Sequence, residues 1–354
     1  MRRWRESSLS DRDNGGTVAA SSDTRDLESD AYGDVGAETT RGGGAGEGGM
    51  GGGNVGTECR DTGNAGQENA ANRVRIFMRI AYDGRGFHGF AYQPEVRTVA
   101  GVLSDAFDAM SCSHSSIVCA GRTDAGVHAK GQVVHVDVDE AFSPRNLAGS
   151  LNRMLAPEVV IREAGMAPPD FHARYSATAR SYRYTILNSW MPDPLMVHRV
   201  WHVREPLDVR SMRMAADCIL GAHDFSAFCR RRKGESPGTP IVREVFRSEL
   251  IVSFPDDQAE GRVLMLDISG GSFCHQMVKS LVGTYVEVGR GRLTPADVYC
   301  LLQSPAGSRV STLAPSAGLC LMRVDYDGCE LRDEYCSFDG RTGRLDAAGH
   351  NIRA

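Results

Sequence analysis

Eight consecutive residues bring together the groups in this chain that are best suited to chemistry: Gly121-Arg122-Thr123-Asp124-Ala125-Gly126-Val127-His128. They follow a short apolar stretch, residues 115–120, which predicts a buried strand. Glycines on both sides of Arg122 and Asp124 permit tight bends and the close approach of a ligand, and catalytic groups often lie on such loops. By spacing alone, an ordinary turn with a local pair between Arg122 and Asp124 is favoured over a catalytic carboxylate.

Further motifs follow in order along the chain. They are Gly131-Gln132-Val133-Val134-His135, the run from Asp170 to Arg180, Tyr182-Arg183-Tyr184, His223-Asp224-Phe225-Ser226-Ala227-Phe228, Phe273-Cys274-His275-Gln276-Met277-Val278 and Gly318-Leu319. Together with the first run they resemble the TruA-type tRNA pseudouridine synthases, over about residues 74–327. The run from Gly121 to His128 matches the signature of that family without a break. On this resemblance, the catalytic interpretation of Asp124 replaces the turn.

The resemblance implies an enzyme that isomerises uridine to pseudouridine at positions 38, 39 and 40 of the tRNA anticodon arm. In this reaction the bond from uracil N1 to ribose C1′ breaks, the base turns and rejoins through C5, and the C5 proton leaves. No redox change, group donor or metal is required, so we expect no cofactor. A carboxylate can act at the sugar as a nucleophile or as a base, and by resemblance Asp124 has this role. The family also implies a homodimer that binds one tRNA across both subunits.

Three more residues are candidate substrate-binding groups by the same resemblance. Arg122 is expected to extrude the target nucleotide and fill the gap, and Tyr182 to stack on the uracil. Lys279 stands where the family usually has Arg, and would be the cation beside Asp124, as a point charge without the bidentate fork. Lys279 and His275 are four residues apart, which predicts a shared helix face. The alternatives are a local Arg122–Asp124 pair, core packing for Tyr182 and an exposed ammonium for Lys279.

Other segments are candidates for RNA contact. The loop from Tyr82 to Phe90 resembles the first loop of the family, and an RNA-facing role and simple packing fit it equally well. The run from Arg230 to Gly234 is basic and has no apolar anchor, so we expect it to contact phosphates. Arg174, Arg180 and Arg183 are further candidates to line the same groove.

Strands and helices alternate along the chain, which predicts an α+β fold with a mixed or antiparallel sheet flanked by helices. Hydrophobic periodicity predicts helices over residues 99–110, 143–155, 208–221 and 273–288 and from 294, and strands over 74–80, 115–120, 134–138, 180–187, 242–252, 262–268 and, last, 319–326. The resemblance implies the pseudouridine synthase fold, with two similar subdomains around a central RNA-binding cleft. We expect a catalytic subdomain over residues 73–180, a second subdomain over 181–330 and a tail over 331–354.

Residues 1–72 differ from the rest of the chain in composition. They contain 16 of the 40 Gly, seven Arg, no Lys and thirteen Asp or Glu. Such a segment buries too little apolar surface to offset its ordering entropy, so we expect a disordered, dispensable tail. The body that follows is nearly neutral overall, with 33 basic and 32 acidic residues. The acidic total therefore does not argue against a nucleic-acid partner for the body.

The chain has ten Cys but no CxxC pair, and no set of residues has the spacing of zinc ligands. Several of these Cys stand inside apolar runs, so we expect reduced, buried thiols in a cytoplasmic protein. No apolar region follows the basic N-terminus as in a signal peptide. No apolar run is long enough to span a membrane, so we expect no membrane partner.

Two other functions remain as alternatives. A non-catalytic RNA-binding or tRNA-folding protein on the same fold would be expected to lose Asp124, which this chain has. A nucleoside glycosidase would need a second carboxylate, and no other acidic residue stands at a suggestive place in the motifs.

Overall fold

The computed structural model describes residues 73–231, 236, 238–254, 261–303, 310, 312–327 and 332–336. The predicted tail over residues 1–72 lies outside these ranges. So do residues 232–234 of the basic run and most of the predicted tail over 331–354.

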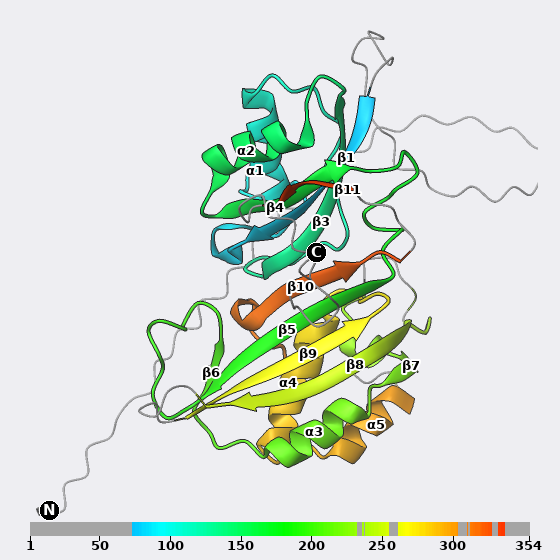
Figure 1. The fold of residues 1–354 in the computed structure, drawn as a ribbon. Helices are drawn as coiled ribbons and strands as arrows, with labels where there is room; N and C mark the ends of the chain where they lie inside the picture. Colours follow the sequence, from blue (N-terminus) through cyan, green and yellow to red (C-terminus); the bar gives the residue numbers. More distant parts are fainter. Residues whose placement is uncertain are drawn as a thin grey trace, which may run out of the picture. The chain divides into compact units, whose positions relative to one another are not determined.

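The described strands form one sheet of eleven strands, mostly antiparallel (Figure 1). Its order is β11-β4-β1-β3-β10-β5-β9-β8-β7, while β2 pairs with β3 and β6 pairs with β5. The strands are β1 Arg73–Tyr82, β2 Val118–Cys119, β3 His128–Asp139, β4 Val159–Met166, β5 Ala179–Asn188, β6 Trp201–Val203, β7 Gly221–Asp224, β8 Val242–Ser253, β9 Arg262–Gly270, β10 Leu319–Asp325 and β11 Arg332–Cys336. With the helices beside it, this sheet confirms the predicted α+β class.

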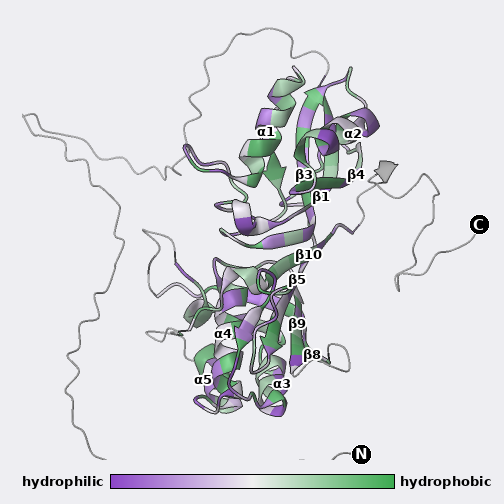
Figure 2. Cartoon of the chain, turned by 90° about the vertical axis from the view of Figure 1, so that its left-hand side faces the viewer, coloured by the Kyte–Doolittle hydropathy of each residue, from purple (hydrophilic) through white to green (hydrophobic). Residues whose placement is uncertain are grey.

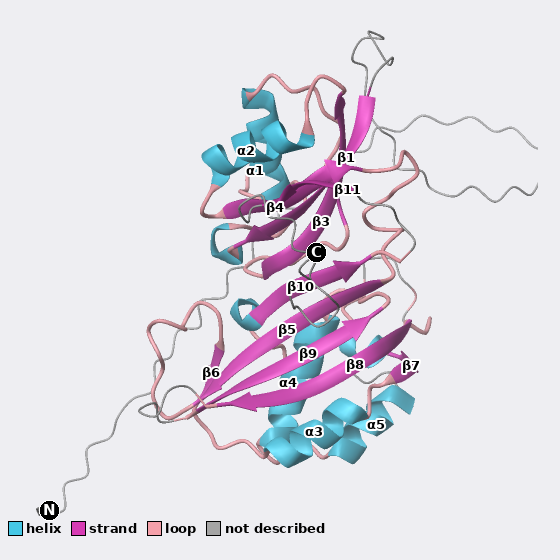
Figure 3. Cartoon of the chain, in the orientation of Figure 1, coloured by secondary structure: helices cyan, strands magenta, loops and turns pink. Residues whose placement is uncertain are grey.

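Five α-helices accompany the sheet in the described residues (Figure 3): α1 Val99–Ala109, α2 Pro144–Leu155, α3 Val209–Asp217, α4 Met277–Gly289 and α5 Pro295–Gln303. Side-chain oxygens of Thr98, Ser143 and Asp208 accept hydrogen bonds from the first free backbone N–H groups of α1, α2 and α3. Pro144 stands at the first position of α2, where the absent N–H costs nothing. No helix in the described part of the chain combines the length and the apolar character needed to cross a membrane.

Two hydrophobic cores lie along the sheet. The first joins β1, β3 and β4 to α1 and α2, and the second joins β5, β8 and β9 to α3, α4 and α5. Hydrophobic residues, green in Figure 2, follow β5 and β9. Leu321 of β10 belongs to the first core and Leu319 to the second, while Tyr182 packs against both. The boundary predicted between residues 180 and 181 falls inside β5, at this junction.

The junction depends on β10, which lies between the two groups of strands. It pairs in parallel with β3, with Cys320 opposite His128, and antiparallel with β5, with Leu321 opposite Tyr182. A Cβ on Gly131 of β3 would lie 2.4 Å from the carbonyl oxygen of Met322. Only glycine therefore lets the backbones come this close.

Three predicted element boundaries and one prediction about thiols are wrong. The helix predicted over 273–288 begins only at Met277, because the preceding Gln276 has a φ of 63°. The helix predicted to reach Gly221 ends at Asp217, and Gly221 begins β7. The strand predicted to be last is followed by β11, which pairs with β4. Cys229 and Cys274 form a disulfide, so the cysteines are not all reduced thiols.

Candidate active site

The loop from Gly121 to Val127 connects β2 to β3 and is fixed by side chains of the first core. Gln132 on β3 donates from Nε2 to the carbonyl oxygen of Gly121 at 2.6 Å, and its Oε1 accepts from the Gly121 N–H at 3.4 Å. The hydroxyls of Tyr82 and Thr123 are hydrogen-bonded at 2.7 Å in the interior. The backbone on both sides of Asp124 is therefore held to the sheet, which gives its side chain a defined starting point.

The loop between β1 and α1 contacts the Asp124 loop and supports it through backbone hydrogen bonds. The Phe90 N–H donates to the carbonyl oxygen of Thr123 at 3.1 Å, and the Gly126 N–H donates to that of Phe87 at 3.3 Å. Gly89 has a φ of +96°, and a Cβ there would lie 2.8 Å from the Thr123 carbonyl oxygen. The rings of Phe87 and Phe90 are buried. The sequence left an RNA-facing role and simple packing open for this loop, and the burial of its two Phe side chains favours packing.

The carboxylate of Asp124 lies against two nitrogen atoms from a single stretch of chain. Lys279 Nζ is 2.8 Å from Oδ2, and His275 Nε2 is 3.5 Å from Oδ1. About a third of the Asp124 side chain is exposed, at 31%, so the carboxylate is held but reachable. Arg122 is exposed and forms no ion pair with Asp124 or with any other described residue. The local Arg122–Asp124 pair is therefore not formed.

Lys279 is buried on α4, where its side chain is only 6% exposed. Its ammonium is 3.5 Å from Ser316 Oγ, and its carbonyl oxygen accepts from the Ala314 N–H at 3.1 Å. An ammonium extended into solvent, the alternative for this residue, is not what the structure has. A buried ammonium needs a counter-charge, and Asp124 supplies it.

Tyr182 of β5 is partly buried beside the same loop. Its ring meets the ring of Phe273 edge to face, with centroids 5.2 Å apart, and a Cβ on Gly121 would lie 3.5 Å from its hydroxyl. Burial raises the pKa of Tyr182 to about 12, against the opposing effect of the Arg180 cation. The phenol is therefore protonated at neutral pH, and it can donate a hydrogen bond or present its ring.

Comparison with known proteins identifies the family of this chain. A family model described as tRNA pseudouridine synthase matches residues 78–176 and 215–327, which include Asp124 and Lys279. The chain belongs to the tRNA pseudouridine synthase family. It is 40% identical over 251 residues to the tRNA pseudouridine synthase A of Syntrophotalea carbinolica, an alignment that covers 71% of this chain and 96% of that protein. The proteins of the same name from Shouchella clausii and Methylobacterium nodulans are 35% and 40% identical, with 93% and 98% of their lengths covered by 71% and 73% of this chain.

Two arginines predicted to line the RNA groove of this synthase have other partners. Arg180 is buried, and its guanidinium donates to the carbonyl oxygens of Ala120 at 3.2 Å and Gly271 at 2.6 Å. Arg183 lies on the opposite face of β5 from Tyr182, because successive residues of a strand alternate, and it pairs with Asp267 at 2.6 Å. The burial of Arg180 contradicts a place in a groove, whereas the expectation for Arg183 stays a prediction. Arg174 is exposed, with its guanidinium 5.6 Å from the Tyr175 ring.

Three neighbours of the synthase site were not predicted as site residues. Phe273 packs on Tyr182, Ser316 lies near the Lys279 ammonium, and His275 lies near Asp124. Phe273 and His275 belong to the motif from Phe273 to Val278, so the resemblance could have indicated them as site residues. Ser316 lies 37 residues after Lys279, in a stretch whose spacing carries no such signal.

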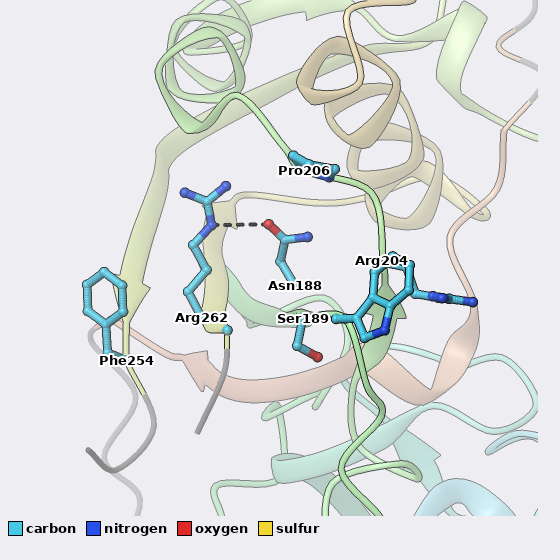
Figure 4. A pocket seen from close by; sticks show the side chains of 8 residues that line it. Asn188, Ser189, Arg204, Pro206, Phe254 and Arg262 are labelled. Atoms are coloured by element: carbon cyan, nitrogen blue, oxygen red, sulfur yellow. Dashed lines mark hydrogen bonds between the residues drawn. The ribbon is translucent and has the colours of Figure 1, made fainter. Parts of the chain in front are cut away.

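One pocket of the described residues has a lining that contains none of these residues (Figure 4). It has a volume of about 400 Å³ and lies at the end of β5, where Arg262 Nε donates to Asn188 Oδ1 at 3.1 Å. The lining residues are Asn188, Ser189, Trp190, Arg204, Pro206, Phe254, Gly261 and Arg262. None of the candidate site residues of this synthase is among them, so the pocket does not mark the reacting centre.

Proposed function

We propose that this protein isomerises uridine to pseudouridine in tRNA, with Asp124 as the catalytic carboxylate. The observation that carries the proposal is the position of Asp124: a partly exposed carboxylate in a braced loop, 2.8 Å from the buried ammonium of Lys279. The ammonium offsets the cost of taking the carboxylate charge partly out of water. The carboxylate is thereby paired with a cation where a substrate can reach it.

The chemistry asks little beyond a well-placed carboxylate. Asp124 acts at the ribose, either by attacking C1′ as the N1–C1′ bond breaks or by removing a proton from the sugar. The released uracil turns and forms the C5–C1′ bond, and the proton on C5 is lost while N1 gains one. Atoms and electrons balance within the nucleotide, so no cofactor takes part.

Access to the target base requires that it leave the helical stack. Arg122 is exposed next to Asp124 and has no hydrogen bond or ion pair among the described residues, so its guanidinium is available to occupy the gap. Tyr182 offers a ring beside the carboxylate for the uracil. Its raised pKa, about 12, keeps the phenol protonated during the reaction at neutral pH.

The substrate and assembly follow from the family resemblance. The relatives are named for tRNA, and we propose uridines 38, 39 and 40 of the anticodon arm as the targets. We also propose that two copies of the chain form a homodimer that binds one tRNA across both subunits, and that the enzyme works in the cytoplasm. The basic residue Arg230 and the exposed Arg174 are available for phosphate contacts.

The decisive experiment incubates the protein with unmodified tRNA transcripts and maps pseudouridine by base-specific chemistry. Wild type is expected to modify the anticodon arm. Asp124→Asn, which keeps the shape of the side chain, should reduce the rate by about 1000-fold or more, as removal of a group that acts on the reacting atoms does. Asp105→Asn, an exposed carboxylate on α1, is the matched control and should be unchanged.

Each alternative makes a different prediction for the same assay. A non-catalytic RNA-binding protein would retain tRNA and make no pseudouridine. A nucleoside glycosidase would release free uracil. Absence of product from wild type on every tRNA tested would refute the proposed function, whereas full activity of Asp124→Asn would refute only the assignment of Asp124.

A further inference from the structure

The two oxygens of Asp124 face different nitrogen atoms. Lys279 Nζ lies 2.8 Å from Oδ2, and His275 Nε2 lies 3.5 Å from Oδ1. A single ammonium attracts one oxygen but does not set the plane of the carboxylate, because an ammonium has no planar fork. A donor on the other oxygen would remove that freedom, and His275 Nε2 lies 3.5 Å from that oxygen.

The His275 side chain is 45% exposed, but the backbone of its segment is fixed by neighbouring residues. The Arg230 N–H donates to the His275 carbonyl oxygen at 3.0 Å, and the neighbouring Cys274 is bonded to Cys229. Gln276 then takes a φ of 63° before α4 begins, a conformation that costs energy for a residue other than glycine. This bend brings His275 and Lys279 to the same carboxylate although His275 is outside the helix.

We propose that His275 is a positioning residue for Asp124, and that it acts together with Lys279 to set the plane of the carboxylate. The inference rests on the proposed function, because it assigns His275 a part in the same reaction. Lys279, which is buried, holds Oδ2, and His275, whose side chain is 45% exposed, holds Oδ1. Loss of His275 lets the carboxylate swing away from the line of attack, and misplacement of a reacting group by about 1 Å can cost about 100-fold in rate.

The test compares rates and affinities for tRNA in five variants. His275→Ala is expected to lower kcat by about 10- to 100-fold and to change KM by less than about twofold. His275→Gln, whose amide nitrogen can reach a similar position, should recover most of that loss. Lys279→Arg with His275→Ala should lie within about threefold of Lys279→Arg alone, because the arginine fork can donate to both oxygens. His223→Ala, which removes a histidine of the edge strand β7, is the control and should match wild type.

Each result separates the inference from its rivals. If His275 contacted RNA instead, His275→Ala would raise KM and leave kcat near wild type, and the inference would be wrong. It would also be wrong if His275→Ala were fully active, or if Lys279→Arg did not diminish the effect of the second change. An equal loss for His275→Gln and His275→Ala would show that the imidazole ring itself is needed and would overturn the donor role. A wild type without pseudouridine activity would instead refute the function, and the melting temperature of each variant identifies loss of folding.

Discussion

Lys279 supplies the positive charge beside Asp124 from a position that water hardly reaches. Its side chain is 6% exposed, and the described residues place no other carboxylate in an ion pair with it. Removal of Asp124 should be costly, by about 3–5 kcal/mol, because the buried Lys279 charge would stay without a partner. The effects of substituting Lys279 and Asp124 on activity are therefore not expected to be additive.

We expect Lys279→Met to lower kcat by about 100-fold or more, a change of about 2.7 kcal/mol in the barrier, since the carboxylate loses the cation beside it. Lys279→Arg should keep most of the activity, because the charge remains and the guanidinium can reach both oxygens. Single-turnover rates with saturating tRNA measure this directly. Equal activity of the methionine and arginine variants would show that the charge is not needed.

Individual site residues differed in how well they could be predicted. The catalytic role of Asp124, which stays a prediction, rests on the resemblance of a run of eight residues, because spacing alone favoured a turn. Lys279 was predictable because it stands in a motif and on a helix that is apolar almost all round. The pairing of Arg183 was not predictable, because a basic residue in a motif gives no information on which face of the strand it occupies, and the partner Asp267 lies 84 residues away.

At the scale of elements, the loop that carries Asp124 is supported by a loop from an earlier part of the chain. The β1–α1 loop meets the Asp124 loop through two backbone hydrogen bonds, and Gly89 lies at the closest point between them. Its φ of +96° and its would-be Cβ contact of 2.8 Å with the Thr123 carbonyl oxygen leave no room for a side chain. The carbonyl belongs to the residue before Asp124, so a displacement here reaches the carboxylate.

Gly89→Ala is expected to lower the free energy of unfolding by about 1–3 kcal/mol, because alanine is strained at this φ, and to lower kcat as well. Gly149→Ala is the matched control. Gly149 lies in α2 with nothing within 4 Å of a would-be Cβ, so alanine there should stabilise the protein by about 0.5–1 kcal/mol. Urea unfolding and initial rates of pseudouridine formation test both. A Gly89→Ala protein as stable and active as wild type would contradict the brace.

Elements with local signals were predicted well. The helix predicted over 143–155 agrees with α2, since Ser143 and Pro144 state where it begins. The start of α4 was missed because hydrophobic periodicity continues through Phe273 and Cys274, while the φ of Gln276 depends on contacts with distant segments. The short β7 was missed for a related reason: it has four residues, and pairing with β8 defines it.

At the scale of the whole described body, the site depends on the register of the central strands. Asp124 precedes β3, Tyr182 is on β5, and β10 joins these strands through Cys320–His128 and Leu321–Tyr182 pairs. The α+β class was predictable from the alternation of patterns. The strand order was not, because β10 pairs with strands about 140 and 190 residues earlier, and such pairings leave no local mark on the sequence.

The stability of the whole fold should also depend on pH through His135. This side chain on β3 is 4% exposed, and its Nδ1 accepts from the Ala173 N–H at 3.0 Å. Burial lowers its pKa to about 4, aided by the nearby Arg75 cation and His172 and opposed by Asp137. In the unfolded chain His135 binds a proton below a pH of about 6.5, whereas in the folded protein it binds one only below a pH of about 4. Stability from this residue is therefore complete above pH 6.5 and is lost as the pH falls.

His135→Gln keeps an acceptor for the Ala173 N–H but does not titrate. Between pH 7.5 and pH 5, wild type should lose about 2 kcal/mol more of its free energy of unfolding than the variant, at about 1.4 kcal/mol for each pH unit below 6.5. Urea unfolding at the two pH values measures the difference. The carboxylates with lowered pKa values, such as Asp137, act mainly below pH 4, and other histidines contribute equally to both proteins. If wild type and variant lose the same free energy between the two pH values, His135 is not held neutral in the folded protein.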